Sequence, residues 1–288
     1  MAYDDLPTER IDPDGPELDR LAPREIARHL LEEEARAHTA VEAAIEDIGA
    51  ACEAAARALR AGGRIVYVGA GTSGRLGVLD AAEMAPTFGA EPGVVVARIA
   101  GGAAAVTEAV EGAEDDDAAG RAAVADTTER DCVVGISMSG SAAYVRAALA
   151  AASGHRVFVT ANAAADVPAD TIVALDLGPE VLAGSTRLKG GSATKAVLNM
   201  ISTAAMAASG AVYGNLMVRV RPTNRKLRDR AERLVMRLAA VERDRAAALL
   251  RGAGDDVRIA VLMARGLDAA AAGTALAAAG GSLREALA

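Results

Sequence analysis

Residues 64–75 read Arg-Ile-Val-Tyr-Val-Gly-Ala-Gly-Thr-Ser-Gly-Arg, in which a run of β-branched and aromatic residues passes directly into a loop rich in glycine and hydroxyl groups. The apolar run predicts a buried β-strand, and the loop is typical of a turn that leads from a strand into a helix. Gly69, Gly71 and Gly74 satisfy the pattern G-x-G-x-x-G, which binds phosphate groups at the N-terminus of a helix. The stretch therefore predicts a parallel α/β fold with a ligand site at this turn.

The phosphate bound by this loop could belong to a dinucleotide or to a phosphomonoester. A dinucleotide site also needs an acidic residue at the end of the second strand, where it holds the ribose. The second predicted strand ends Ala97-Arg-Ile-Ala-Gly-Gly102 and offers no acid. We therefore expect Gly71, Thr72 and Ser73 to bind a phosphomonoester through backbone N–H groups and hydroxyls. A tight turn that is merely capped by Thr72 and Ser73 is the alternative.

Four further apolar runs follow the first one, and the stretches between them are long enough for crossover helices. They are residues 94–99, 132–136, 156–160 and 171–175. Near-continuous apolar strands between helices indicate a parallel sheet that is covered on both faces. The fold class that we expect is α/β, with a parallel sheet of about five strands and a ligand site beyond the carboxyl ends of the strands.

The chain divides into three predicted regions. Residues 1–60 form an extended arm rich in Pro, Asp and Glu, followed by one or two N-terminal helices. Residues 61–225 form the α/β domain. Residues 226–288 form a small C-terminal helical module, which begins with one charged helical stretch, residues 226–251.

The stretch of residues 196–218 carries no charge and is long enough to span a bilayer. Asn199, Ser202 and Asn215 are among the polar residues that interrupt it, and its many alanines are only weakly hydrophobic. We therefore expect a buried helix of a globular domain here and no membrane association.

The charge balance argues against nucleic acid and anionic membranes as partners. Asp and Glu outnumber Lys and Arg by 39 to 31, which gives a formal net charge of −8. The N-terminus lacks the basic and apolar segments of a signal peptide. Cys52 and Cys132 are far apart and have no His or Cys partner at metal spacing. We expect two buried thiols, a cytoplasmic location and no metal site.

A second hydroxyl cluster follows the third predicted strand, where Ser137, Ser139 and Ser141 alternate around Gly140. Because parallel strands end at the same edge of a sheet, loops that follow neighbouring strands converge on one ligand. We expect these serines to share the phosphorylated ligand with the first loop. Helix capping by the serines is the alternative.

Lysine is rare in this chain and occurs only at Lys189, Lys195 and Lys226. Two of the three lie in the glycine- and hydroxyl-rich segment 184–195. In a chain that otherwise uses Arg, a local pair of lysines indicates a need for a compact ammonium group near a phosphate or a sugar oxygen. We expect Lys189 to contact the ligand, and chance clustering is the alternative.

Two positions offer carboxylates for chemistry. Glu83 lies on the helix predicted after the first loop, and Glu111 and Glu114 lie three residues apart, which predicts that these two share a helical face. A solvated acidic surface is the alternative for each position.

Six ordered motifs at compatible spacing resemble those of the N-acetylmuramic acid 6-phosphate etherases. They are Tyr67–Glu83, Pro86–Gly89, Ile99–Gly102, Ala109–Asp115, Gly184–Arg187 and Tyr213–Val218. The likeness extends from Thr8 and Glu9 in the arm to a C-terminal module similar to a ubiquitin-associated three-helix fold. It implies the sugar isomerase (SIS) fold, a three-layer α/β sandwich, in a homodimer whose site is near the subunit interface.

The resemblance also implies the reaction, which cleaves the D-lactyl ether of N-acetylmuramic acid 6-phosphate, a phosphorylated amino sugar. The products are N-acetylglucosamine 6-phosphate and D-lactate, and no cofactor is implied. In the ring-opened aldehyde the C2 proton is acidified by C1, so a base can remove it while an acid protonates the departing oxygen; water then adds to the alkene. The implied catalytic pair is Glu83, as the acid, and Glu114, as the base. The residues implied to hold the phosphate and the sugar are Gly71, Thr72, Ser73, Ser137, Ser139, Ser141 and Lys189.

Two departures separate this chain from the etherase pattern. Residues 138–144 read Met-Ser-Gly-Ser-Ala-Ala-Tyr where etherases tend to read Ala-Ser-Gly-Arg-Thr-Pro-Tyr, and residues 84–85 read Met-Ala in place of Cys-Pro. The second hydroxyl loop and residues 189–195 look more like the related glucokinase regulatory proteins, which bind fructose phosphates without turnover. A noncatalytic sugar-phosphate sensor and a sugar-phosphate isomerase of the same fold are therefore the alternatives. The pair Glu83 and Glu114 favours the etherase.

Overall fold

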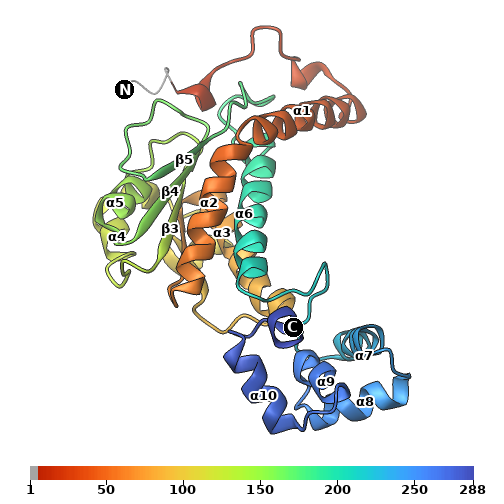
Figure 1. The fold of residues 1–288 in the computed structure, drawn as a ribbon. Helices are drawn as coiled ribbons and strands as arrows, with labels where there is room; N and C mark the ends of the chain where they lie inside the picture. The colour runs from red at the N-terminus through yellow and green to blue at the C-terminus, as the bar shows by residue number, and fades with distance from the viewer. Residues whose placement is uncertain (1–5) are drawn as a thin grey trace. The chain divides into compact units, whose positions relative to one another are not determined.

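Two compact units make up the protein, whose computed structural model describes residues 6–288 (Figure 1). The first unit comprises residues 6–82 and 93–203, and the second comprises residues 83–92 and 204–288. The first five residues of the predicted arm lie outside the described residues. The sequence predicts three regions instead, and that division stays a prediction.

A five-stranded parallel sheet forms the centre of the first unit. Its strands lie in the order β2-β1-β3-β4-β5, and every neighbouring pair is parallel. This arrangement confirms the predicted α/β fold class. The strands are β1 (Ile65–Gly69), β2 (Val95–Ile99), β3 (Cys132–Ile136), β4 (His155–Thr160) and β5 (Thr171–Ala174).

Helices cover both faces of this sheet and give the unit three layers, which can be followed in Figure 1. Val66 and Val68 pack with Leu149 of α5 in one buried cluster. Tyr67, between them, faces the opposite side, because successive side chains of a strand alternate, and there it approaches Gly77 of α3. The helices in or entering this unit are α1 (Pro23–Ala43), α2 (Ile45–Arg60), α3 (Gly71–Phe88), α4 (Asp117–Ala122), α5 (Ala143–Ala151) and α6 (Lys189–Ala208).

Two helix predictions differ from the structure. The uncharged stretch 196–218 is not one helix, because α6 ends at Ala208 and Gly210 adopts a left-handed φ of +75°. The charged stretch 226–251 is also interrupted, because Ala240 adopts a left-handed φ of 53° at the end of α7. Hydrophobic periodicity carries no information about such single backbone conformations, so neither break was predicted.

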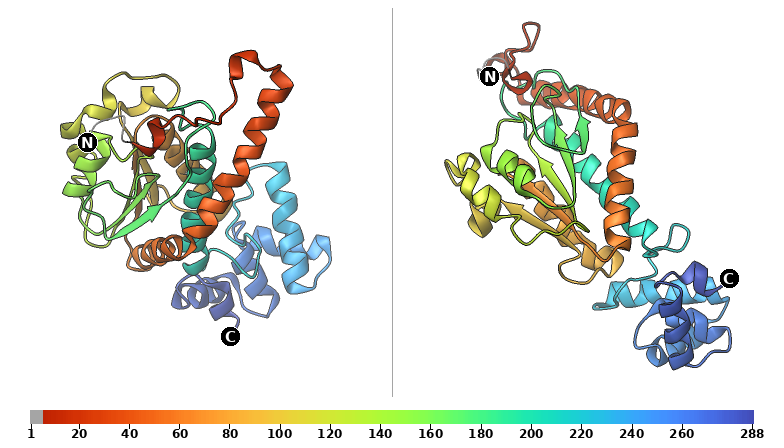
Figure 2. Two further views of the ribbon diagram at one scale, coloured as in Figure 1. Left: turned by 90° about the horizontal axis from the view of Figure 1, so that it is seen from above. Right: turned by 60° about the vertical axis from the view of Figure 1, so that its left-hand side comes forward.

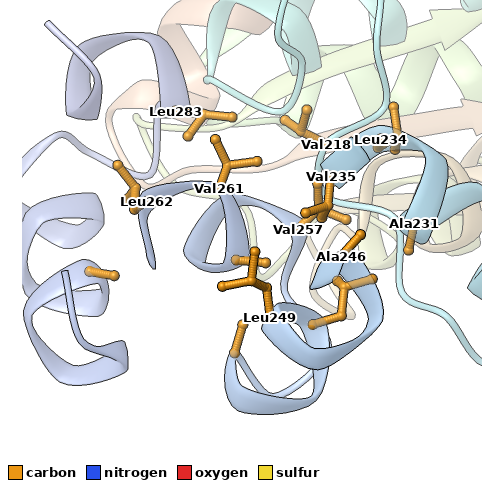
Figure 3. Close-up of a cluster of buried hydrophobic side chains, with 14 of the residues drawn as sticks. Val218, Ala231, Leu234, Val235, Ala246, Leu249, Val257, Val261, Leu262 and Leu283 are labelled. Atoms are coloured by element: carbon orange, nitrogen blue, oxygen red, sulfur yellow. The ribbon is translucent and has the colours of Figure 1, made fainter. Parts of the chain in front are cut away.

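The second unit contains five helices around its own hydrophobic core. Figure 3 shows side chains of this core, among them Val235 of α7, Leu249 of α8 and Val261 of α9. These side chains are between 0% and 3% exposed, so the helices stabilise one another by burial of apolar surface. The helices are α7 (Arg225–Ala239), α8 (Arg243–Gly252), α9 (Val257–Ala264), α10 (Ala269–Ala278) and α11 (Leu283–Ala286).

Within residues 6–288, no single helix is both long and apolar enough to cross a membrane. The helices α9 and α10 meet the length and composition criteria only when they are taken together, and the pair is bent by 114°. Val261 of α9 and Ala272 of α10 are both buried in the core of the second unit.

A buried carboxylate joins α3 and α6 to the sheet. Asp80 of α3 is 3% exposed. Its carboxylate accepts hydrogen bonds from the Tyr67 hydroxyl at 2.8 Å, from the Asn199 side-chain amide at 2.6 Å and from the Ser202 hydroxyl at 3.2 Å. Burial raises the pKa of Asp80, and these hydrogen bonds oppose that effect. A carboxylate this deeply buried is tolerated because three donors are directed at it.

Replacement of Asp80 by Asn should lower the free energy of unfolding by about 1–3 kcal/mol, because the new amide group turns a donor toward groups that are themselves donors. Chemical denaturation followed by circular dichroism measures the change. Asp117→Asn, at the exposed ion pair with Arg121, is the matched control and should cost less than about 1 kcal/mol. An Asp80→Asn variant as stable as the wild type would contradict the structural role of this carboxylate.

Candidate functional site

A cavity of about 270 Å³ lies at the carboxyl ends of β1 and β3, which are neighbours in the sheet. It is lined by the N-terminal arm, by the loops that follow the two strands, and by two turns that carry Glu114 and Thr186. In the left view of Figure 2, the short 3₁₀ helix of the arm (Pro7–Glu9) lies over this end of the sheet. Open parallel sheets bind their ligands at this edge.

The loop after β1 is tight because α3 begins almost directly at the end of the strand. A Cβ on Gly69 would lie 2.7 Å from the backbone nitrogen of Gly74, and a Cβ on Gly74 would lie 2.7 Å from the carbonyl oxygen of Gly69. Only glycine permits this approach. Gly71, Thr72 and Ser73 form the first turn of α3 and line the cavity. The backbone N–H groups of a first helical turn have no partner within the helix and attract anions.

The loop after β3 carries the second predicted hydroxyl cluster to the same cavity. The N–H of Gly140, in the left-handed conformation with φ 72°, donates to the Ser137 carbonyl at 3.1 Å. The hydroxyls of Ser139 and Ser141 lie 2.7 Å apart, and the Asn162 amide donates to the Ser139 carbonyl at 2.9 Å. All three serines line the cavity. The structure therefore brings both hydroxyl loops together.

Glu114 lines this cavity as well. It belongs to a short 3₁₀ turn, Ala113–Asp115, which follows Gly112 in the left-handed conformation with φ 72°. The prediction that Glu111 and Glu114 share a helical face is wrong. Gly112, between them, adopts a left-handed conformation, and the 3₁₀ turn that contains Glu114 begins only at Ala113. Glu111 is absent from the described residues that line the cavity. Glu114 is thus the only one of the two acids that the fold presents to a ligand there.

Arg75 ties the segment that carries Glu114 to α3. Its Nε donates to the Val106 carbonyl at 3.2 Å, and its Nη2 donates to the Glu108 carbonyl at 2.8 Å. The segment contains only short 3₁₀ turns, so it has few backbone hydrogen bonds of its own. The planar guanidinium group, with its fixed set of donors, therefore restrains a stretch of chain that would otherwise be loosely held.

Glu83 lies on the same helix as the first loop but is distant from it. At a rise of about 1.5 Å per residue it lies about 18 Å along the axis from Gly71. Its side chain is exposed, and it is absent from the described residues that line the cavity. Leu79, one turn earlier on α3, is 51% exposed, and Met200 of α6 is 38% exposed. In a single chain, Glu83 is therefore not part of this cavity.

Lys189 takes part in a buried ion pair. Its side chain is 1% exposed, and its Nζ lies 2.5 Å from the Glu33 carboxylate and 2.5 Å from the Pro179 carbonyl. It too is absent from the described lining residues. A buried ammonium group requires such acceptors. The lysine that the sequence assigns to the ligand thus anchors the start of α6 to α1 in this structure.

Next to Lys189, a buried acid, Glu180, supports the start of α6. Glu180 is 5% exposed, and it accepts a hydrogen bond from the backbone N–H of Gly190 at 2.9 Å. Burial raises the pKa of Glu180, while the hydrogen bond from Gly190 lowers it. Nothing in the residue pattern predicted this role, because the acid and the helix that it supports are joined by an irregular loop.

Three residues of the arm line the cavity without having been assigned to it from the sequence: Leu6, Thr8 and Glu9. Leu6 and Thr8 are 4% and 5% exposed. The local motif of Thr8 and Glu9 was the only signal available, since periodicity and spacing do not connect an irregular arm with a distant sheet edge.

Neither cysteine lines the cavity. Cys132 is buried in β3, and burial raises its pKa to about 12, whereas Cys52 is only partly buried. Both are free thiols. Within residues 6–288, no group of three or more His, Cys, Asp and Glu side chains is arranged to hold a metal ion.

A larger cavity, of about 730 Å³, lies in the second unit. Three of its arginines, Arg221, Arg228 and Arg258, each form an ion pair with a neighbouring carboxylate. Such pairs are common on protein surfaces and carry little functional information. None of the predicted site residues lines this cavity. The smaller cavity is therefore the candidate site.

Comparison with known proteins adds an independent observation. An N-acetylmuramic acid 6-phosphate etherase from Gloeobacter violaceus is 50% identical to this chain over 290 residues, which cover 98% of this chain and 95% of that protein. The chain belongs to the N-acetylmuramic acid 6-phosphate etherase family. Etherases from Salmonella choleraesuis and Salmonella typhimurium are each 48% identical to it, over 98% of both chains. The resemblance found in the sequence motifs is thus confirmed at nearly full length.

The family model of the glucokinase regulatory protein N-terminal SIS domain matches residues 47–153. This range runs from α2 to the end of α5 and includes both hydroxyl loops and Glu114. The match confirms the SIS-type fold that was expected for this member of the etherase family. Among solved structures, a putative phosphosugar isomerase involved in capsule formation from Bacteroides fragilis is 18% identical, with a TM-score of 0.45, over 67% of this chain and 98% of that chain.

Replacement of Arg75 by Gln should loosen the segment that carries Glu114. Amide hydrogen exchange in residues 102–116 should become about tenfold faster or more, because two hydrogen bonds of about 1 kcal/mol each are lost. Exchange measured by mass spectrometry reports the change peptide by peptide. Arg121→Gln, whose partner Asp117 lies on the exposed side of α4, is the matched control. Unchanged exchange in Arg75→Gln would show that the segment is held by other contacts.

Proposed function

We propose that this protein cleaves the D-lactyl ether of N-acetylmuramic acid 6-phosphate, giving N-acetylglucosamine 6-phosphate and D-lactate. The observation that carries the proposal is the 50% identity with an etherase of that name along nearly the whole chain. The cavity at the ends of β1 and β3 supports it, because it combines an anion-binding helix N-terminus, two hydroxyl loops and a carboxylate.

The phosphate is held by neutral donors in this proposal. Within the described residues, the cavity lining contains no Lys and no Arg. The first turn of α3 offers the N–H groups of Gly71, Thr72 and Ser73, and the loop after β3 offers the hydroxyls of Ser137 and Ser139. Such arrays of oriented dipoles bind phosphate without a formal positive charge.

The elimination needs a base and an acid. The base, Glu114, removes the C2 proton of the open-chain sugar, whose aldehyde at C1 acidifies that position. Electrons of the C2–H bond form a C2–C3 double bond, while the bond from C3 to the ether oxygen breaks and an acid protonates the departing lactate oxygen. Water then adds across the double bond, placing a hydroxyl on C3 and a proton on C2. The products contain all atoms of the substrate and of one water molecule.

The acid, Glu83, comes in this proposal from a second copy of the chain. Its exposure on α3 and its distance of about 18 Å along the helix from Gly71 support that origin. Exposed Leu79 and Met200 lie on α3 and α6, and apolar side chains at a helix surface favour burial against a partner. A homodimer with two sites, each built from both subunits, follows from this assignment.

A cytoplasmic location is part of the same proposal. It rests on the free thiols of Cys52 and Cys132, which suit a reducing compartment.

A noncatalytic sugar-phosphate sensor is the second candidate. It is favoured by the match of residues 47–153 to the SIS domain of glucokinase regulatory protein and by the departure of residues 138–144 from the etherase pattern. The presence of Glu114 in the cavity supports the etherase instead, because the elimination requires a base and Glu114 offers a carboxylate for that role.

Purified protein should release D-lactate from N-acetylmuramic acid 6-phosphate, as measured with D-lactate dehydrogenase. Glu114→Gln should lower kcat by about 10²–10⁴-fold, because the amide cannot accept the C2 proton. Glu111→Gln is the matched control, since its carboxylate lies outside the described lining of the cavity, and it should retain wild-type activity. Tight binding of fructose 6-phosphate without any lactate release would favour the sensor.

Co-expression of Glu83→Gln and Glu114→Gln subunits should restore activity that neither variant has alone. Random pairing makes about half of the dimers mixed, and each mixed dimer contains one intact site, so about a quarter of wild-type activity is expected. Isolation of the mixed dimer with two different tags permits a direct kcat measurement. An inactive mixed dimer would show that Glu83 and Glu114 do not act across the subunit interface.

A further inference from the structure

The N-terminal arm forms a wall of the candidate site. Leu6 and Thr8 are almost fully buried. The Thr8 carbonyl accepts a hydrogen bond from the backbone N–H of Gly184 at 3.1 Å, and the N–H of Glu9 donates to the Leu6 carbonyl at 3.0 Å. The first hydrogen bond ties the arm to the turn that carries Gly184, and the second stabilises the short 3₁₀ helix of the arm itself.

Glu9 brings a second carboxylate to the cavity that Glu114 lines. A Cβ on Gly184 would lie 3.1 Å from Oε2 of Glu9, and Gly184 has a left-handed φ of 78°, so a glycine at this position leaves room for the carboxylate. The Thr8 hydroxyl lies 3.4 Å from Oε1 of Glu9, which is a weak contact. A carboxylate can accept about four hydrogen bonds. Glu9 therefore has acceptor capacity to offer to a ligand.

The lining of the cavity contains both hydrogen-bond donors and carboxylates, which accept hydrogen bonds. The loops after β1 and β3 present N–H and hydroxyl donors, which suit a phosphate. Glu9 presents only acceptors and a negative charge, which repels a phosphate dianion. The part of an amino sugar phosphate that lies away from its phosphate carries hydroxyl O–H groups and an acetamido N–H group. A carboxylate binds such donors through charge-assisted hydrogen bonds.

We propose that Glu9 binds the O–H and N–H donors of the sugar, so that the arm and the sheet loops together select the ligand. The inference rests on the proposed function, because it takes a phosphorylated amino sugar as the ligand. Glu9 has no part in proton transfer in this assignment. Its contribution is binding energy for the sugar that the substrate and the transition state share, while the loops after β1 and β3 hold the phosphate.

Calorimetric titration with two ligands tests this assignment. Glu9→Gln and Glu9→Ala should weaken the binding of N-acetylglucosamine 6-phosphate by about tenfold or more, because hydrogen bonds to a charged group are lost. Both variants should bind inorganic phosphate at least as tightly as the wild type does, because the negative charge of Glu9 contributes only repulsion to that ligand. Glu17→Gln is the matched control, because Glu17 lies on the same arm, pairs with Arg20 and is absent from the described cavity lining.

Kinetics provide a second measurement. KM for N-acetylmuramic acid 6-phosphate should rise about tenfold or more in Glu9→Ala, with kcat within about threefold of the wild-type value. Unchanged affinity for the sugar phosphate would overturn the inference. An equal loss of affinity for the sugar phosphate and for inorganic phosphate would also overturn it, because the arm would then support the cavity as a whole. A wild type that neither binds N-acetylglucosamine 6-phosphate nor releases lactate would overturn the proposed function and this inference with it.

Discussion

The close approach of Gly69 and Gly74 is the constraint on which the site depends. A Cβ on either residue would lie 2.7 Å from the backbone of the other, so the chain can turn from β1 into α3 within this distance only with glycine at both positions. The turn leaves the unpaired N–H groups of the first helical turn at the end of β1. Because Gly69 pairs with Ile136 in the parallel register of β1 and β3, the serine loop after β3 begins at the same level. The tight turn and the register of the two strands together bring both loops to the same edge of the sheet.

Among the described residues, the charged groups that line the cavity are carboxylates, whereas the nearby cations make contacts outside its lining. Among the described residues, the lining offers hydroxyls, backbone amides and two carboxylates, while the ammonium group of Lys189 is buried against Glu33 and the guanidinium group of Arg75 bonds main-chain carbonyls. The cations thus fix the positions of α6 and of the segment that carries Glu114. The rest of the polar lining includes backbone N–H groups at the start of α3 and hydroxyls on the loops that follow β1 and β3.

Local patterns predicted the strands, their parallel arrangement and the two hydroxyl loops, because apolar runs and glycine spacing report on nearby residues. The remaining features depend on single backbone conformations or on distant partners. Gly112 in the left-handed conformation separates Glu111 from Glu114, although their spacing fits a helix. Lys189 meets Glu33, a residue far away in the sequence, and the arm residue Thr8 meets Gly184 in the same way. No periodicity encodes such long-range pairs.

The helix α3 carries Gly71, Thr72 and Ser73 in its first turn and Glu83 further along. A helix is a rigid spacer, so the interval between these two features is set by the number of residues and not by their identity. Inserting or deleting one residue between Gly71 and Glu83 would rotate the glutamate by about 100° and shift it by about 1.5 Å. On the exposed face of α3, positions other than Glu83 should therefore tolerate substitution better than the helix tolerates a change in the number of residues before Glu83.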